Sequence, residues 1–234
     1  MTDATFPRTP RTTLKRYPQR AHYDRATVHR VLDDGYMCTI GFVHEGSPRV
    51  LPTGYGRIGD FIYVHGSNAS TMLGAILKSP EICLSVTHVD GLVLGRSLFA
   101  HAVNYRSVVI FGRAERVTDD DEKRASFEAY AERFLKGRYA DVRPPNQKEL
   151  NSVTVVRISI DEAVAKLRSG SGIDLDEDLD RDCWAGLLYI KQSVCEVIRD
   201  PKGRQDVPPP PYVKNYERLP SKGDPTIINT APKL

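Results

Sequence analysis

The sequence lacks the marks of several protein classes. No apolar stretch approaches the roughly 20 residues that a membrane-spanning helix requires, and the N-terminus has no apolar segment typical of a secretory signal peptide. The formal net charge over 234 residues is only +3, and no nucleic-acid-binding module is recognisable. We therefore expect neither a membrane nor a nucleic acid as partner.

Metal-site, disulfide and common catalytic motifs are also missing. The four cysteines contain no Cys-x-x-Cys pair and no zinc-like spacing, and Cys38 and Cys83 lie in apolar runs, where a free thiol behaves as a small hydrophobe. We expect reduced cysteines, no metal site and a cytoplasmic protein. A basic N-terminus and the C-terminal Pro232-Lys233-Leu234 leave a mitochondrial or peroxisomal location open. Rossmann, P-loop, HExxH and GxSxG motifs are absent.

Composition divides the chain into three parts. Residues 1–22 are basic and interrupted by prolines, which predicts an extended arm that packs on a partner. Residues 23–199 carry the apolar runs of a folded domain. Residues 200–234 are rich in proline and predict a loose tail.

Short apolar runs separated by turn-forming residues predict six or seven strands. We expect them at residues 36–43, 49–55, 61–65, 81–89 and 152–160, with two more within 90–117. Asp90-Gly91 indicates a turn, and residues 104–107 lie between the last two apolar runs. Helices are expected after Asp24 and Ser70 and from Thr118. This order predicts a mainly β, antiparallel barrel with a few peripheral helices.

Two segments carry polar residues where a ligand could bind. Arg96 and His101 stand among apolar residues, and buried polar groups need partners, which can be a ligand or internal hydrogen bonds. Residues 66–70 precede a predicted helix, where free N–H groups favour an anion. Capping of that helix by Asn68 or Ser70 would explain the same loop without a ligand.

Four blocks in order, VLPTGYGRIGDFIYVHGSNAS, VTHVDGLVLGRS, HAVNYRSVVIFGRAERV and WAG, resemble the pyridoxamine 5′-phosphate oxidase-related flavin-binding family. The branch most similar includes the nitroimidazole-resistance proteins, and the similarity spans roughly residues 11–188. The resemblance implies a split β-barrel with Greek-key-like topology. It also implies a homodimer that binds FMN in clefts between its two subunits.

The resemblance also implies flavin contacts, residue by residue. The positions along the flavin ring are Arg49, Leu51 and Thr53. The positions on the ribityl-phosphate side are Tyr63, His65, Gly66, Ser67 and Ser70. The hairpin strands would add Asn104, Tyr105, Arg106 and Ser107, and Trp184 would approach from the partner subunit.

One departure from the family pattern concerns the phosphate. Oxidase-type members carry basic residues directly after the serine that corresponds to Ser70, whereas this chain has Thr71 and Met72. A buried phosphate without a cation is costly, so we expect Arg49, Arg96 or Arg106 to supply the charge. If none of them does, FMN would bind weakly or another cofactor would occupy the cleft.

The expected function is that of an FMN-binding oxidoreductase that passes electrons between a reduced donor and a small molecule. Because the flavin itself supplies the redox chemistry, no catalytic triad is needed. His101 is a candidate proton donor to the substrate. A deazaflavin-binding barrel, a haem-binding barrel and a non-enzymatic dimer, with or without a cofactor, remain alternatives.

Overall fold

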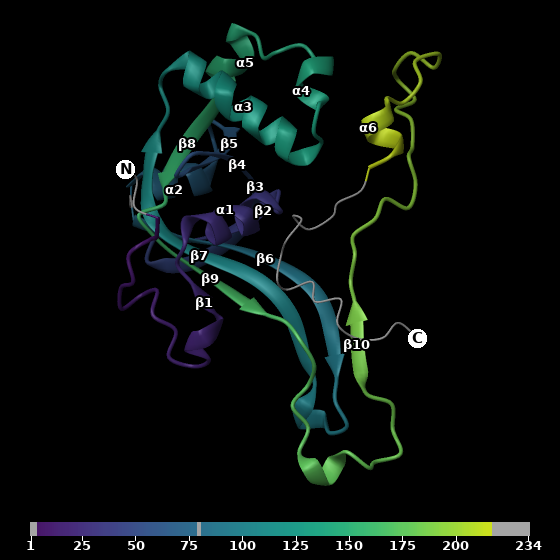
Figure 1. Ribbon diagram of the computed structural model, residues 1–234. Helices are drawn as coiled ribbons and strands as arrows, with labels where there is room; N and C mark the ends of the chain where they lie inside the picture. The colour runs from purple at the N-terminus through teal and green to yellow at the C-terminus, as the bar shows by residue number, and fades with distance from the viewer. Residues whose placement is uncertain (1–3, 79–80, 217–234) are drawn as a thin grey trace.

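The computed structural model describes residues 4–78 and 81–216 (Figure 1). Within them the chain forms ten strands. These are β1 (Ala21–His22), β2 (Met37–His44), β3 (Ser47–Gly54), β4 (Gly56–Ile58), β5 (Phe61–Ser67), β6 (Glu81–Leu94), β7 (Ala102–Arg116), β8 (Val153–Ser159), β9 (Glu162–Arg168) and β10 (Gly186–Tyr189).

Helices lie around these strands in the same described residues. The α-helices are α1 (Arg25–Asp33), α2 (Thr71–Lys78), α3 (Asp120–Phe134), α4 (Arg138–Asp141), α5 (Gln147–Ser152) and α6 (Pro211–Lys214). The 3₁₀ turns are η1 (Pro18–Arg20), η2 (Leu98–Ala100) and η3 (Asp176–Asp178). None of the helices in residues 4–78 and 81–216 is long and apolar enough to cross a membrane.

All strand pairs are antiparallel, and the main sheet runs β3-β2-β6-β7-β8-β5-β4. Strand β9 adds to β7, β1 to β9, and β10 to β6. The sheet curves without closing, which confirms the predicted mainly β split barrel. Beyond the barrel, β6 and β7 continue as a long curved hairpin that projects from the body (Figure 1).

Strand β7 changes its second partner at Gly112. It pairs with β9 up to Phe111 and with β8 from Ala114 onward. A Cβ atom at Gly112 would lie 1.7 Å from the backbone oxygen of Ser159. Only glycine permits the backbone of β7 to come this close to Ser159, at the point where β7 leaves β9 and begins to pair with β8.

The core lies between the inner sheet face and helices α1 and α2. Leu32 of α1, Ile76 of α2, and Ile40, Leu84 and Ile110 of the sheet are all fully buried. The strand residues alternate between this core and the outer face, as the two-residue period of a strand requires.

Local capping defines the helix starts. The Asp24 side chain accepts a 2.8 Å hydrogen bond from Thr27 N, which confirms the predicted start of α1. The predicted start of α3 at Thr118 was wrong by one residue, because the N-cap is Asp119, whose side chain accepts from Glu122 N at 2.8 Å. Acidic residues then fill the first turn of α3, where the helix dipole favours them.

The predicted turn at Asp90-Gly91 was wrong. Strand β6 runs through both residues, and only a register shift against β7 between Val89 and Gly91 marks the position. Residues 104–107 also form no turn, since they lie inside β7, where all four pair with β6 and residues 105–107 pair with β9 as well. Strand β9 was not predicted, and its Ala and Lys residues have low β propensity.

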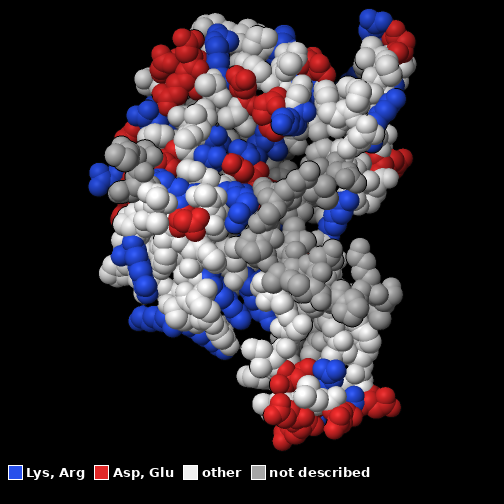
Figure 2. Space-filling model, viewed as in Figure 1, with Lys and Arg blue, Asp and Glu red and all other residues white. Residues whose placement is uncertain are grey.

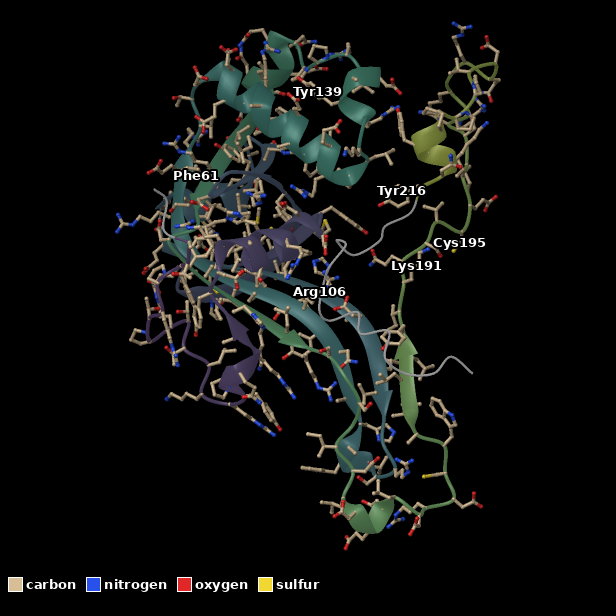
Figure 3. The ribbon with its side chains drawn as sticks, in the orientation of Figure 1. Phe61, Arg106, Tyr139, Lys191, Cys195 and Tyr216 are labelled. Carbon is tan, nitrogen blue, oxygen red and sulfur yellow. The ribbon has the colours of Figure 1, made fainter. Side chains whose placement is uncertain are left out.

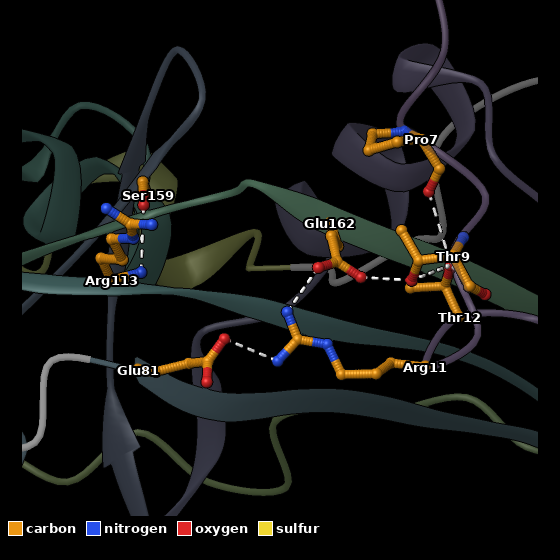
Figure 4. A network of polar contacts seen from close by, with 8 residues as sticks. All are labelled: Pro7, Thr9, Arg11, Thr12, Glu81, Arg113, Ser159 and Glu162. Atoms are coloured by element: carbon orange, nitrogen blue, oxygen red, sulfur yellow. Dashed lines mark hydrogen bonds and ion pairs between the residues drawn. The ribbon is translucent and has the colours of Figure 1, made fainter.

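The N-terminal arm packs on its own barrel, and its predicted packing on a partner stays a prediction. Phe6 is only 2% exposed and belongs to the core. Arg11 lies 4.6 Å above the Phe111 ring and forms ion pairs with Glu81, at 2.7 Å, and with Glu162 (Figure 4).

The C-terminal segment after β10 is irregular from Lys191 up to helix α6. In α6 the Tyr212 hydroxyl accepts a hydrogen bond from Arg138. The remainder of the predicted loose tail, with Pro232-Lys233-Leu234, lies outside the described residues.

Candidate functional site

Tyr105 and Ser107 lie on the outer face of the sheet. Their cross-strand neighbours are Arg168 and Lys166 on β9, and Val89 and Thr87 on β6. Both side chains are half-buried, and within the described residues neither hydroxyl has a hydrogen-bond partner. This part of the outer face therefore offers two hydroxyl groups and the Lys166 ammonium group to a ligand, and beside them lies the Arg168 guanidinium, which also donates to Asn104.

Asn104 and Arg106 point to the opposite, inner side of β7. Arg106 is 2% exposed. Its Nε and Nη2 donate to Asp90, both at 2.9 Å, and its Nη1 donates to Asp34. Figure 3 shows Arg106 where the hairpin leaves the body. Asn104 donates to Gly170 O at 3.1 Å and accepts from Arg168. These two residues hold the strands together.

Arg96 and His101 lie at the far end of the hairpin. The Arg96 backbone N–H donates to Asp174 at 2.7 Å and its guanidinium at 3.1 Å, which together hold the pKa of Asp174 below its usual range. Arg96 thus has a structural ion pair. His101 is exposed, and its Nδ1 lies 2.8 Å from Ser97 O. Acidic side chains of residues 174–182 surround this end (Figure 2).

Tyr63 and His65 face helix α3. The Tyr63 hydroxyl donates to Glu122 at 2.9 Å, and burial together with this hydrogen bond raises the pKa of Tyr63 to about 12. The His65 ring centroid lies 4.7 Å from that of Phe127 and 4.8 Å from that of Tyr130. Burial lowers the pKa of His65, so its ring is neutral at pH 7. The aromatic side chains of α3 cover both residues.

The loop of residues 66–70 is largely satisfied by its own hydrogen bonds. Ser70 Oγ accepts from Leu73 N at 3.3 Å, and Ser67 Oγ accepts from Ala69 N at 3.2 Å. The capping interpretation of this loop is therefore confirmed for Ser70. Gly66 faces the inside of the barrel, where a Cβ would lie 3.3 Å from a Leu73 methyl group.

Sequence reasoning missed one cation near this loop. Arg116 donates to Thr154 at 2.9 Å, and Thr154 donates to Asn68 at 2.9 Å. Among the described residues no carboxylate pairs with Arg116. Its distance along the chain from residues 66–70 hid it, because only the pairing of β8 with both β5 and β7 brings them together.

Arg49, Leu51 and Thr53 lie on edge strand β3. Their partners on β2 are Phe42, Ile40 and Cys38, so their side chains share the inner face of the sheet. Arg49 is exposed and has no ion pair within the described residues. Trp184 is 58% exposed, and its ring lies beside Gly186 of the same chain.

The predicted flavin-contact residues do not come together in one chain. Asn104 and Arg106 point inward, Arg96 lies at the far end of the hairpin, and Trp184 lies beside Gly186. The others occupy three places. Arg49, Leu51 and Thr53 lie on an edge strand, the residues of β5 and its loop lie under α3 and α2, and Tyr105 and Ser107 lie on the outer face. Next to Tyr105 that face continues as an exposed apolar row across β6, β7 and β10, consisting of Val89, Leu92, Val103 and Leu188. Contiguous exposed apolar residues of this kind mark interaction surfaces.

Comparison with known proteins identifies the class. The family model described as pyridoxamine 5′-phosphate oxidase matches residues 24–167, and the chain belongs to this family. No curated protein matches the chain. The flavocytochrome Anf3 from Azotobacter vinelandii is 36% identical, with a TM-score of 0.80 over 88% of this chain and 96% of the other.

Two further solved structures are similar. The FAD and haem binding protein from Mycobacterium smegmatis is 32% identical, with a TM-score of 0.79 over 85% of this chain and 97% of the other. A putative 5-nitroimidazole antibiotic resistance protein from Bacteroides thetaiotaomicron is 19% identical, with a TM-score of 0.54 over 62% of this chain and 85% of the other. The last supports the fold alone.

Proposed function

We propose that this protein is a flavin-binding redox protein that holds its flavin against the outer sheet face at Tyr105 and Ser107. The observation that carries the proposal is the similarity over nearly the whole chain to a flavocytochrome and to a FAD and haem binding protein. The FAD and haem binding protein favours FAD as the flavin, and FMN, implied by the sequence resemblance, is the alternative. When bound, the flavin would supply hydride and electron transfer between a reduced donor and a small molecule.

The chain's own residues fit such a group. The unpartnered hydroxyls of Tyr105 and Ser107 can bind polar atoms at the edge of the flavin, and Lys166 and Arg168 can neutralise its phosphates. Arg96 and Arg106 are held by carboxylates and take no part in this proposal. Under this proposal, the cations of β9 supply the positive charge that the sequence lacks after Ser70.

A homodimer belongs to the proposal. The apolar row of Val89, Leu92, Val103 and Leu188 borders Tyr105, and burial of such a row stabilises association. A partner subunit would cover the flavin on this face and could bring its own edge strand and Trp184 to it. Light scattering of the purified protein tests the assembly, with twice the mass of one chain expected.

Haem binding is a second candidate function, and it rests on His101. The exposed His101 ring holds Ser97 O with Nδ1, which leaves Nε2 open. Histidines that bind metals typically fix their other ring nitrogen in this way. A haem band in the spectrum that is lost in His101→Gln would support this role, whereas an unchanged band would leave His101 as the predicted proton donor.

The absorption spectrum of the purified protein tests flavin binding, followed by mass identification of any released cofactor. We expect flavin bands, or their appearance after addition of FAD. Tyr105→Ala should weaken flavin binding by about tenfold, equivalent to ~1.4 kcal/mol. Tyr139→Ala makes the same change on α4, away from the sheet face (Figure 3), and should bind flavin as the wild type does. A wild-type protein that takes up no flavin contradicts the proposal.

A further inference from the structure

Beside the proposed flavin face lies a cluster of cations and an aromatic ring, here called the N-terminal basic patch: Arg16, Tyr17, Arg20, Lys166 and Arg168. The guanidinium carbon of Arg20 lies 4.1 Å from the centre of the Tyr17 ring, and that of Arg16 lies 5.1 Å from it. Figure 2 shows Lys and Arg side chains along the lower left of the body, where Figure 1 places β1.

The charge of this patch is uncompensated. Among the described residues no carboxylate forms an ion pair with Arg16, Arg20, Lys166 or Arg168. Arg16, by hydrogen bonding and charge, and then Arg20 and Arg168 lower the pKa of Tyr17. Burial and then the charge of Arg20 lower the pKa of Arg168, so the cations lie close enough to repel one another. An anion would relieve this repulsion.

The backbone of the patch is held in an uncommon conformation. Tyr17 has φ 58° and ψ 56°, the left-handed region that non-glycine residues rarely adopt. A hydrogen bond of 3.0 Å from Arg20 N to Tyr17 O and the fixed φ of Pro18 maintain the turn. Strained positions of this kind occur preferentially at ligand sites.

The sheet register connects the patch to the proposed flavin face. Arg168 lies opposite Tyr105, and Lys166 lies opposite both Ser107 on β7 and Ala21 on β1. A ligand on the Tyr105 side of β7 can therefore extend across β9 to Tyr17, which is 37% exposed.

We propose that the N-terminal basic patch binds the adenosine diphosphate moiety of a dinucleotide. The guanidinium group of arginine can donate two hydrogen bonds to phosphate oxygens, and both a planar guanidinium group and a phenol ring can stack on a purine. This inference rests on the proposed flavin binding in so far as the moiety belongs to FAD. A nicotinamide dinucleotide acting as electron donor carries the same moiety and is the second source.

The test compares ligands on the wild type and on the Arg16→Gln/Arg20→Gln double variant. Titration calorimetry measures ADP alone and NADH, and flavin fluorescence measures FAD and FMN. Loss of phosphate contacts from arginine should weaken ADP and dinucleotide binding by about tenfold or more and leave FMN binding unchanged. Arg113→Gln is the single-charge control, since it lies eight residues, about 26 Å, further along β7 than Tyr105.

Each result has a defined meaning. Selective loss of FAD affinity in the double variant supports the inference with FAD as source, and selective loss of NADH affinity supports it with the donor as source. If the wild type binds no ADP and binds FAD no more tightly than FMN, the inference is overturned while flavin binding stands. If the wild type binds ADP but no flavin, the patch is supported and the proposed flavin function fails.

Discussion

Replacement of Arg106 by methionine should cost more stability than removal of any exposed arginine. The Arg106 side chain is 3% exposed, and its carboxylate partners Asp34 and Asp90 are 9% and 12% exposed. Methionine fills a similar volume but removes the guanidinium group that both buried carboxylates bind.

The magnitude follows from this burial. Removing one partner of a buried ion pair costs about 3–5 kcal/mol, chiefly because the remaining charge is left without compensation. With a urea m-value of about 2 kcal/mol/M, the unfolding midpoint of Arg106→Met should fall by about 1.5–2.5 M. An exposed pair costs far less, about 0–1 kcal/mol.

Urea unfolding followed by circular dichroism measures this difference. Arg204→Met is the control, because Arg204 is 77% exposed and pairs with an exposed Asp206. Adding Asp90→Asn to Arg106→Met removes one uncompensated charge and should restore part of the lost stability. A loss below about 1 kcal/mol in Arg106→Met would refute the structural role. It would also return Arg106 to the candidate phosphate ligands.

Three further predictions follow from burial and close contact. Burial holds the pKa of His65 below its unfolded value of about 6.5, so the stabilising contribution of the neutral ring is complete above that pH and is lost as the pH falls. Between about pH 7.5 and pH 5, the free energy of unfolding should therefore drop by less in His65→Phe than in the wild type. Burial raises the pKa of Cys38 to about 12 and also raises that of Cys83, so a maleimide should label only the two exposed cysteines of the native protein and all four after unfolding. Gly112→Ala places a Cβ atom 1.7 Å from the backbone oxygen of Ser159 and should lower the free energy of unfolding, measured with urea, by more than about 2 kcal/mol. Gly74→Ala is the control, because no atom lies within 4 Å of the added Cβ, and it should not destabilise the fold.

Local features of the fold were predictable from the sequence, and distant pairing was not. The Asp24 cap and most short strands depend on neighbouring residues, and the sequence blocks also identified the family. The continuity of β6 through Asp90-Gly91 depends on β7 and β10, which hydrogen-bond to it on either side. Strand β9 forms because β7 offers an edge, despite its low β propensity.

The candidate site was predictable only in part for the same reason. Once residues 104–107 are placed in a strand, the two-residue period separates Tyr105 and Ser107 from Asn104 and Arg106. Treating them as one polar group therefore joined outward ligand candidates to inward structural residues. The ion pairs of Arg106 with Asp34 and of Arg96 with Asp174 join residues 72 and 78 positions apart, which no local pattern reveals.

Titration of the cofactor-free protein with FAD, followed by the change in flavin fluorescence, tests the central claim most directly. We expect saturable binding of one FAD per chain, which is weakened by Tyr105→Ala and unaffected by Tyr139→Ala. Absence of binding by the wild type, or equal binding by both variants, would contradict a flavin site on the outer face of this sheet.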